Sequence, residues 1–412
     1  MRMFMRCRES GVATGLFTAL VATTSPVAAQ PLGERDAINA SLAQGESTAL
    51  DEAEQAAADA RIGLVRRFDN PELSVSRDQV SGSGGRETEY HVGVSQPISI
   101  SGQRSSLRTA ARAEAFAVGA DIGRRRQERA AATREAYASC AAAGEKLAIL
   151  NDYAGRLREA ERVVGLRTRA GDTAGYDLRR LRVEAGAASA QQRLAQGEQQ
   201  GQCLTLARLT GLSAARPTAT TAELLGRNPT AAAGAAAAAT RRDLVARERR
   251  VDSLAAEVDA ARRARLPDLT VGVGYKRLSN DAGSAAGPTV GLGVRLPLFN
   301  NGSAAVTEAR ARMRAREAEL VRARREVDAA VAAAAARAAA ATAAALVAES
   351  TAADANRLSS IADAAYQGGE SGVVELVDGY RTARDARLSV IELAEQAILA
   401  TIAQSLAEGR DL

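Results

Sequence analysis

An internal duplication is the feature that most constrains how this chain can fold. The stretch "NPELSVS" at 70–76 corresponds to "LPDLTVG" at 266–272, and each opens a proline-bracketed segment that is followed by more than 110 residues without proline. The long proline-free runs are interrupted alike, because Gly171 in the first run has its counterpart in Gly369, 198 positions later. Self-similarity over half a chain indicates that one structural plan is used twice. We therefore expect two similar halves.

The proline-free runs are predicted to be long helices packed closely side by side. Alanine and arginine dominate them, aromatic residues make up only 3% of the chain, and tryptophan is absent. Apolar residues recur three and four positions apart, as in "LRRLRVEAGAASAQQRLA", which favours coiled-coil pairing. The pattern predicts helices over 36–67, 102–170, 174–209, 240–265, 302–366 and 371–407.

Two short segments in each half alternate between apolar residues and small or polar ones. Leu269, Val271 and Val273 skip over Thr270 and Gly272, a period of two that is typical of a strand with one apolar face. Segments of about ten such residues fit lipid-facing strands of an outer-membrane barrel, although a soluble hairpin with one wet face has the same pattern. The predicted strands are 71–80 and 88–99, then 267–278 and 288–299, joined by glycine- and serine-rich loops at 80–87 and 280–288.

The N-terminus predicts export from the cytoplasm. Three arginines precede an apolar run, and small residues follow before Gln30, as in a secretory signal peptide. The alanine-rich run 329–348 contains Arg337 and is expected to be a packed helix rather than a transmembrane one. The chain is thus divided into a signal peptide at 1–29, a first repeat at 30–212, a linker at 213–239 and a second repeat at 240–412.

Four strands per chain are too few to close a membrane barrel, because the smallest closed barrels have about eight. An open sheet edge is not tolerated in lipid, so several copies must share one barrel, and three copies supply twelve strands. We predict a mainly α fold with a small β part. In it, the long helices form antiparallel coiled-coil hairpins, and three copies with four strands each would close a twelve-stranded β-barrel.

Two cysteines offer a test of the first predicted hairpin. Cys140 lies 31 residues before Gly171 and Cys203 lies 32 after it, so antiparallel helices turning at Gly171 would bring them to nearly the same height. An oxidising periplasm would allow a disulfide between them. Two buried free thiols remain the alternative, and Cα atoms more than about 7 Å apart would exclude the bond.

Neither an enzyme nor a cofactor site is predicted. The single histidine, His91, falls in a predicted strand, and the cysteines lack metal-ligand spacing, so no bound metal is expected. No phosphate loop and no nucleophile with a histidine base is found. Of the 54 basic residues only Lys146 and Lys276 are lysine, which we interpret as coding bias, so nucleic acid is not an expected partner.

The order helix, two strands and broken pair of long helices, repeated once after a signal peptide, resembles the TolC family of outer-membrane efflux proteins. The resemblance covers essentially the whole mature chain and rests on "NPELSVS", "QPISISGQR", "RAGDTAGYDLRRLRVEA", "LPLFNNGSAAVTEARAR" and "YQGGESGVVELVDGYRTARDA". The forms "NPEL" and "QPISISGQR" are most similar to the cobalt–zinc–cadmium resistance branch. The resemblance implies a homotrimer whose helical hairpins form a periplasmic α-barrel and whose strands form a twelve-stranded β-barrel. It also implies a location in the outer membrane, in contact with its lipid, with an extension into the periplasm.

The resemblance also assigns a role to the breaks in the long helices. There the chain would turn at the periplasmic end of each hairpin, where a periplasmic adaptor protein docks. A plain helix-ending turn without a partner is the simpler alternative. The residues of these two tips are Gly171, Asp172, Thr173, Gly369, Glu370 and Ser371.

Entrance residues of the family carry over to four positions. Asp177 is expected to link to Tyr366, while Glu375 and Asp378 lie one helix turn apart on one face. Three copies would stack these acids into rings that concentrate cations, unless the two acids belong to an ordinary solvated face. Ser371 stands where some members have a gate arginine, so the closed state is expected to be held differently here.

The implied function is that of a passive duct in a tripartite efflux system. It would conduct substrate from a periplasmic adaptor and an inner-membrane transporter of the resistance–nodulation–division type to the exterior, with heavy-metal cations as the first expectation. Multidrug or organic-solvent efflux and type I secretion would use a similar duct. The alternative from another class is a periplasmic coiled-coil scaffold without a pore.

Overall fold

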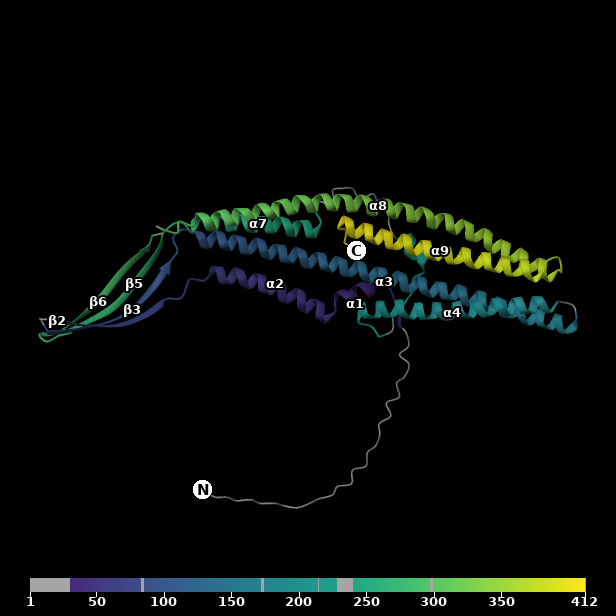
Figure 1. The fold of residues 1–412 in the computed structure, drawn as a ribbon, viewed down its shortest axis with the longest axis horizontal. Coiled ribbons are helices and arrows are strands. Elements are labelled where there is room, and N and C mark those ends of the chain that lie inside the picture. The colour runs from purple at the N-terminus through teal and green to yellow at the C-terminus, as the bar shows by residue number, and fades with distance from the viewer. Residues whose placement is uncertain are drawn as a thin grey trace, which may run out of the picture.

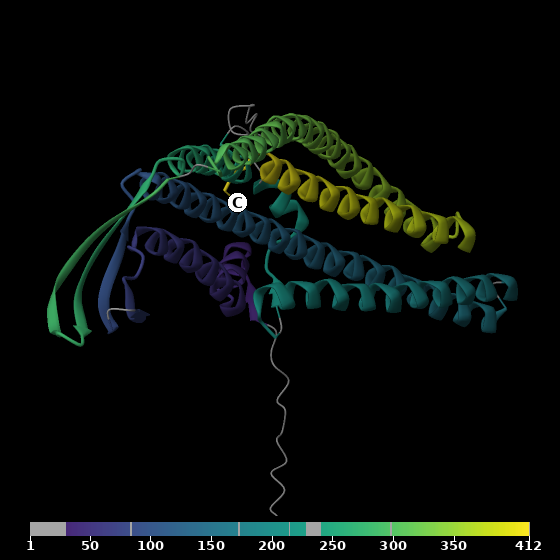
Figure 2. The same ribbon diagram turned by 60° about the vertical axis from the view of Figure 1, so that its left-hand side comes forward.

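The computed structural model describes residues 30–82, 85–171, 174–213, 215–227, 240–296 and 299–411. The predicted signal peptide, Asp172 and Thr173 lie outside the described residues. The chain is elongated, with a β-sheet at one end and long helices leading away from it. At the opposite end the long helices are connected in pairs by two tight turns (Figure 1). Figure 2 shows that the strands curl away from the line of the helices.

Both halves have the order helix, two strands, two long helices. The first half consists of α2 (Gly45–Arg66), β2 (Glu72–Gly82), β3 (Gly85–Ile98), α3 (Gln103–Ala170) and α4 (Gly175–Thr210). The second consists of α7 (Arg242–Arg263), β5 (Asp268–Asn280), β6 (Gly283–Arg295), α8 (Ser303–Gln367) and α9 (Val373–Glu408). Left-handed glycines recur at matching places in the two halves: Gly85 and Gly283, Gly102 and Gly302, Gly171 and Gly369, Gly211 and Gly409. The predicted mainly α fold with a small β part and an internal duplication is confirmed.

The four long strands form one antiparallel sheet in the order β2-β3-β5-β6. Val75 pairs with Val92, Val92 with Tyr275, and Tyr275 with Pro288, so these residues project on one side of the sheet. The same face carries further apolar residues: Leu73, Val94, Leu269, Val271, Val273, Val290, Leu292 and Val294. The opposite face carries small or polar ones, among them Ser74, His91, Gly93, Gly274, Lys276 and Thr289.

The strands are longer, and their connections shorter, than the sequence led us to expect. Residues 280–288 were expected to form a loop, but β5 continues to Asn280 and β6 begins at Gly283. The glycine, serine and alanine of this segment have low strand propensity. From Gly283 on, each nevertheless faces a partner in β5, as Ala285 faces Leu278. Pairing with a neighbouring strand therefore overrides local preference here.

The long helices pack through small side chains. Ala142 and Ala154 of α3, Ala188 of α4 and Ala397 of α9 are at most 1% exposed. In the second hairpin a β-carbon placed on Gly379 would lie 2.7 Å from the β-carbon of Ala362, a separation that real β-carbons do not adopt. Such close packing explains how a chain with few aromatic residues buries its helices.

A disulfide joins the two helices of the first hairpin. Cys140 of α3 and Cys203 of α4 are bonded, with their Cα atoms 4.8 Å apart, within the separation that a disulfide spans. Cys140 is 2% exposed. Of the two alternatives left open by the sequence, the structure therefore has the bond rather than two free thiols.

Part of the segment expected to be a linker, 213–239, is ordered. β4 (Ala215–Pro217) pairs in parallel with β1 (Gln30–Leu32), and α5 (Thr221–Arg227) packs against α9. Tyr137 of α3 explains the order, because its buried hydroxyl donates to Leu32 O at 2.8 Å and accepts from Thr218 N at 3.0 Å. The remaining residues of the linker, 228–239, lie outside the described part of the chain.

The N-terminal helix expected over 36–67 is broken in two. α1 (Glu34–Leu42) ends before α2 begins at Gly45. Between them, the side-chain amide of Gln44 donates to Arg208 O at 3.1 Å and Leu209 O at 2.9 Å. These are carbonyls of the last turn of α4, which have no partner within their own helix. The break therefore lets one side chain cap a distant helix.

Candidate functional site at the hairpin tips

Each long hairpin turns on a glycine at the end of the molecule opposite the sheet (Figure 1). Gly171 follows α3 with φ +87°, and α4 begins four residues later at Gly175. Gly369, with φ +74°, lies between α8 and α9. Glycine adopts this left-handed conformation at low cost and commonly ends helices. The breaks noted in the sequence are thus the two tips of the helical body.

The second tip is ordered by its own polar groups. Glu370 N donates to Ala365 O at 2.9 Å, which closes the end of α8. The carboxylate of Glu375 accepts from Gly372 N at 3.1 Å and so caps the start of α9. Glu375 and Asp378 are both exposed. With Glu370, which is also exposed, the tip presents three carboxylates to solvent, and that of Glu375 also holds the turn.

Within one chain the structure does not link Asp177 to Tyr366, so that expectation is wrong for a single copy. The hydroxyl of Tyr366 is buried and has no hydrogen-bond partner among the described residues. Its ring packs in the core between the hairpins, and the guanidinium carbon of Arg167 lies 5.3 Å from the ring centroid. Asp177 is half-buried in the first turn of α4. The hydroxyl of Ser371 is likewise buried without a partner.

A hydrophobic cluster holds the two hairpins together above their tips. It draws side chains from all four long helices, so neither hairpin buries it alone. We call it the tip core; its larger members are Tyr153, Leu157, Val164, Leu181, Tyr366, Val373, Leu376, Val377 and Tyr380.

A charged cluster beside the tip core joins α3, α4 and α9. Tyr153 donates its hydroxyl proton to Glu184 Oε1 at 2.5 Å. Arg381 donates from Nε to the same oxygen at 2.8 Å and from Nη2 to Glu184 Oε2. A bidentate arginine–carboxylate pair of this kind is stronger than a neutral hydrogen bond. We call Tyr153, Glu184 and Arg381 the hairpin junction.

The hairpin junction stays charged at neutral pH. The hydrogen bonds from Arg381 lower the pKa of Glu184, although burial opposes them, and the bond from Tyr153 adds to the effect. Burial, reinforced by the Glu184 carboxylate, raises the pKa of Tyr153 to about 12. Glu184 therefore remains an anion and Tyr153 a donor, which is the state in which both bonds form.

Further polar contacts surround the junction. Arg387 of α9 pairs with Asp152 of α3 at 2.9 Å, a second ion pair between the hairpins. The guanidinium carbon of Arg384 lies 4.5 Å from the centroid of the Tyr153 ring. Arg381, Arg384 and Arg387 lie three residues apart on one face of α9, so the contacts extend over about two turns of that helix. On α3 they meet the adjacent residues Asp152 and Tyr153.

Sequence reasoning missed the junction. Glu184 and Arg381 are 197 residues apart, and no local motif connects them. One signal was available, because Glu184 lies 13 residues after Gly171 (184 − 171) and Arg381 lies 12 after Gly369 (381 − 369). Side chains at equal distances from two adjacent tips fall at the same height.

The family comparison decides the class of protein. The family described as outer membrane efflux protein matches residues 37–212 and 234–408, which together span most of the chain and both repeats. The chain belongs to the outer membrane efflux protein family. It is therefore a component of an efflux channel, located in the outer membrane and extending into the periplasm. No curated protein sequence matches it significantly.

Solved structures share the fold of this efflux protein. A membrane protein from Pseudomonas aeruginosa matches with a TM-score of 0.77 and 19% identity, over 91% of this chain and 92% of that one. CusC matches with a TM-score of 0.76 and 18% identity, over 92% of each chain. The CmeC outer membrane channel of Campylobacter jejuni gives 0.73 and 16%, over 91% and 85% respectively. The elongated, duplicated fold is thus shared along almost the whole length.

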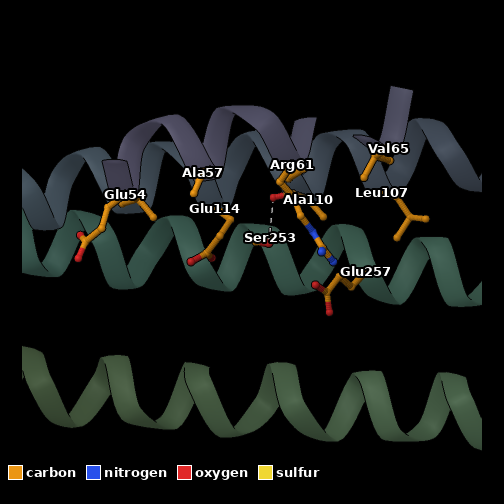
Figure 3. Close-up of a pocket in the computed structure, with 12 residues that line it drawn as sticks. Glu54, Ala57, Arg61, Val65, Leu107, Ala110, Glu114, Ser253 and Glu257 are labelled. Carbon is orange, nitrogen blue, oxygen red and sulfur yellow. Dashed lines mark hydrogen bonds between the residues drawn. The ribbon is translucent and has the colours of Figure 1, made fainter. Parts of the chain in front are cut away.

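A cavity of about 540 Å³ lies in the efflux protein between α2, α3 and α7, away from the tips (Figure 3). Alanine forms much of its wall. Two of its carboxylates are already paired, Glu54 with Arg125 at 2.5 Å and Glu114 with Arg250 at 3.4 Å. We interpret it as a gap between alanine-rich helices. Among the described residues, no group of three or more histidine, cysteine, aspartate or glutamate side chains is arranged to hold a metal ion.

Helices α8 and α9 of the efflux protein each contain a stretch long and apolar enough, by composition alone, to cross a membrane. In α8 this stretch has a mean hydropathy of 1.7, which comes from its alanine content. Only 11% of this stretch is buried within the chain, and both helices run to the second tip.

Proposed function

We propose that the chain assembles as a homotrimer whose twelve strands close one barrel in the outer membrane. The observation that carries this is the sheet's two free edges. Within the described chain β2 pairs with β3 alone and β6 with β5 alone, so strands of 11 and 13 residues each keep one edge unpaired. Lipid does not tolerate such edges. Pairing β6 of one copy with β2 of the next would satisfy both.

In this assembly the long helices would form a helical barrel across the periplasm. α3 has 68 residues, which at about 1.5 Å per residue amounts to roughly 100 Å. Residues 1–29 would be the signal peptide, and the mature chain would comprise the repeats 30–212 and 240–412. The adaptor would dock on the tips, formed by Gly171, Asp172, Thr173, Gly369, Glu370 and Ser371.

The tips would also form the entrance of the duct. Glu375 and Asp378 are exposed at the start of α9, and three copies would bring six such carboxylates around one axis. Asp177 would lie near the same level on the first hairpin, whereas Tyr366 packs in the tip core behind the entrance. A ring of carboxylates concentrates cations at a constriction.

The hairpin junction would hold the entrance closed. Glu184 ties the first hairpin to Arg381 of the second, close above the tips, where the family's gate arginine is replaced by Ser371. Opening requires the second hairpin to move away from the first, and this movement breaks the junction. The junction is thus a candidate latch. It lies about three helical turns above Ser371, the position at which some members of the family have a gate arginine.

The cargo proposal follows from the resemblance to the cobalt–zinc–cadmium branch. The duct would carry heavy-metal cations supplied by a periplasmic adaptor and an inner-membrane transporter of the resistance–nodulation–division type. An acidic entrance supports passage of cations, although the duct itself would not select among them. Multidrug or organic-solvent efflux and type I secretion remain the alternative cargoes.

Growth of a deletion strain tests the cargo. The strain should be challenged with graded zinc, cobalt, cadmium and copper and with a panel of organic toxicants, and complemented with the wild-type gene. We expect sensitivity to metals alone, restored by complementation. Sensitivity to organic compounds alone would contradict the metal proposal and leave the duct intact. A carbonate wash that releases the protein from membranes would instead favour the scaffold alternative.

A further inference from the structure

The part of the sheet farthest from the helices separates its charges by sign. Arg77 pairs with Tyr90, and Tyr90 with Arg277, so both arginines share the face that carries Val75, Val92 and Tyr275. Arg86, opposite Ser81 near the hairpin turn, lies on this face as well. The carboxylates of the strands in the same segment, Asp78, Glu87 and Glu89, all lie on the opposite face. Asp281, in the turn between β5 and β6, accepts a hydrogen bond from the backbone N of Arg86 at 3.3 Å.

The three arginines are exposed and have no ion pair among the described residues. Arg77, Arg86 and Arg277 are all exposed, and the nearest polar contact of Arg77 is a 3.3 Å hydrogen bond to Gln79. On the opposite face, by contrast, Lys276 is neutralised by Glu89 at 2.6 Å. Arg277 and Lys276 are neighbours in sequence, so the face decides which charge is compensated. The outward arginines thus offer unneutralised positive charge.

The arginines begin where the apolar band ends. Outward positions along β5 are apolar from Leu269 to Tyr275, and Arg277 is the next one. A membrane-crossing strand needs about 9–11 residues, and 268–276 satisfies this length. Tyr90 and Tyr275 stand at the border, as aromatic residues do at membrane interfaces. With the helices in the periplasm, this border faces the outer leaflet.

We propose that Arg77, Arg86 and Arg277 form a cationic collar that binds the phosphate groups of the outer-leaflet lipid. The inference rests on the proposed trimeric barrel, in which three arginines from each of three copies would encircle the pore at headgroup height. Guanidinium binds phosphate through paired hydrogen bonds. The Tyr90 ring, 5.5 Å from the guanidinium carbon of Arg77, steadies that side chain at the interface.

Lipid binding to the purified full-length channel in detergent tests the collar. The probes are lipid A carrying both phosphates and the same lipid after dephosphorylation, and the readouts are the thermal unfolding midpoint and the lipid retained in native mass spectra. The wild type should be stabilised by the phosphorylated lipid and much less by the dephosphorylated one. The triple variant Arg77→Gln, Arg86→Gln, Arg277→Gln should lose at least half of the shift, with about tenfold weaker retention.

A matched pair of single variants isolates the face of the sheet. Arg277→Gln and Lys276→Gln each remove one positive charge at adjacent positions, and only Arg277→Gln should weaken lipid retention. Equal retention in both, or equal stabilisation of the wild type by dephosphorylated lipid, overturns the collar. Single-channel conductance checks assembly: a wild type without channels refutes the barrel, whereas intact channels with unchanged lipid responses refute the collar alone.

Discussion

The two helical hairpins follow one plan but are reinforced differently. The first, α3 with α4, carries the Cys140–Cys203 disulfide, and α3 is buried along much of its length, including the large side chains of Tyr137 and Tyr153. The second, α8 with α9, contains no cysteine. Its helix α8 is exposed along most of its length and buries mainly alanine.

This difference teaches that the duplication preserved the backbone and let the side-chain reinforcement diverge. The left-handed glycines coincide in both halves, yet only the first hairpin is cross-linked. It provides a fixed frame within one chain, while α8 offers an alanine-rich surface that neighbouring copies can cover. The hairpin junction is where the second hairpin is fastened to that frame.

Removing the disulfide, which only the first hairpin has, should cause the largest loss in the free energy of unfolding. Cys140→Ser with Cys203→Ser opens a connection over a sequence separation of 63 residues. Chain entropy predicts a loss of about 4 kcal/mol in the free energy of unfolding, measured as a lower denaturation midpoint by circular dichroism. Reductant should lower the midpoint of the wild type and leave the double variant unchanged. The same response to reductant in both proteins would contradict the assignment of a disulfide between Cys140 and Cys203.

Breaking the hairpin junction should release the second hairpin. Arg381→Gln leaves the carboxylate of Glu184, whose side chain is 11% exposed, without its cation. Because Arg381 is 43% exposed, solvent screening reduces the cost to about 1–2 kcal/mol, or roughly a tenfold rise in open probability. Single-channel recording measures this open probability. Arg182→Gln is the control, since its pair with Glu161 at 3.2 Å stays within the first hairpin.

Acid should break the same junction. The pKa of Glu184 is lowered from its ordinary value of 4.5, so the stabilisation is complete above that value and is lost as the pH falls through the lower folded-state pKa. Open probability should stay constant from neutral pH to about 5 and rise only in stronger acid. In Arg381→Gln the rise should begin at higher pH. A wild-type transition near neutral pH would exclude Glu184 as the titrating group.

Removing acidic side chains from the tips should have a smaller effect, a loss of cation selectivity, and this loss should differ between the two tips. Glu375→Gln with Asp378→Asn removes the two exposed carboxylates at the start of α9 and leaves Glu370 of the turn in place. Glutamine at 375 still accepts the capping bond from Gly372. Cation selectivity, measured as a reversal potential in a planar bilayer, should fall about twofold. Asp177→Asn, on the first tip, should change it less because Asp177 is half-buried. An unchanged reversal potential in the double variant would rule out the acidic entrance.

The duplication, the helices and the two faces of the sheet could be predicted because each follows from local periodicity. The alternation of Val271 and Val273 with Gly272 is visible in the sequence without knowledge of the rest of the fold. The turn at 280–288 was harder, because its small residues become strand only through pairing with β5. Strand length thus depended on a partner that local propensity does not reveal.

The features that escaped prediction depend on side chains meeting across the fold. Gln44 breaks the N-terminal helix to cap α4, and Tyr137 orders residues near 215–218 that look like linker. The Asp177–Tyr366 link failed within one chain because the Tyr366 ring turns into the tip core. Position in a repeat indicates height along the body, but it does not indicate the direction in which a side chain points.

The free edges of β2 and β6 also have a consequence for biogenesis. A single copy has no stable state inside a bilayer, because its unpaired strand edges would remain unsatisfied there. The helical body differs, since its disulfide and its tip core are complete within one chain. In the proposed trimer, folding of the body can therefore precede insertion, whereas insertion needs copies to meet. The rate of insertion should then rise steeply with the concentration of the chain. The step that limits membrane integration of the proposed trimer is thus the meeting of copies rather than the folding of each one.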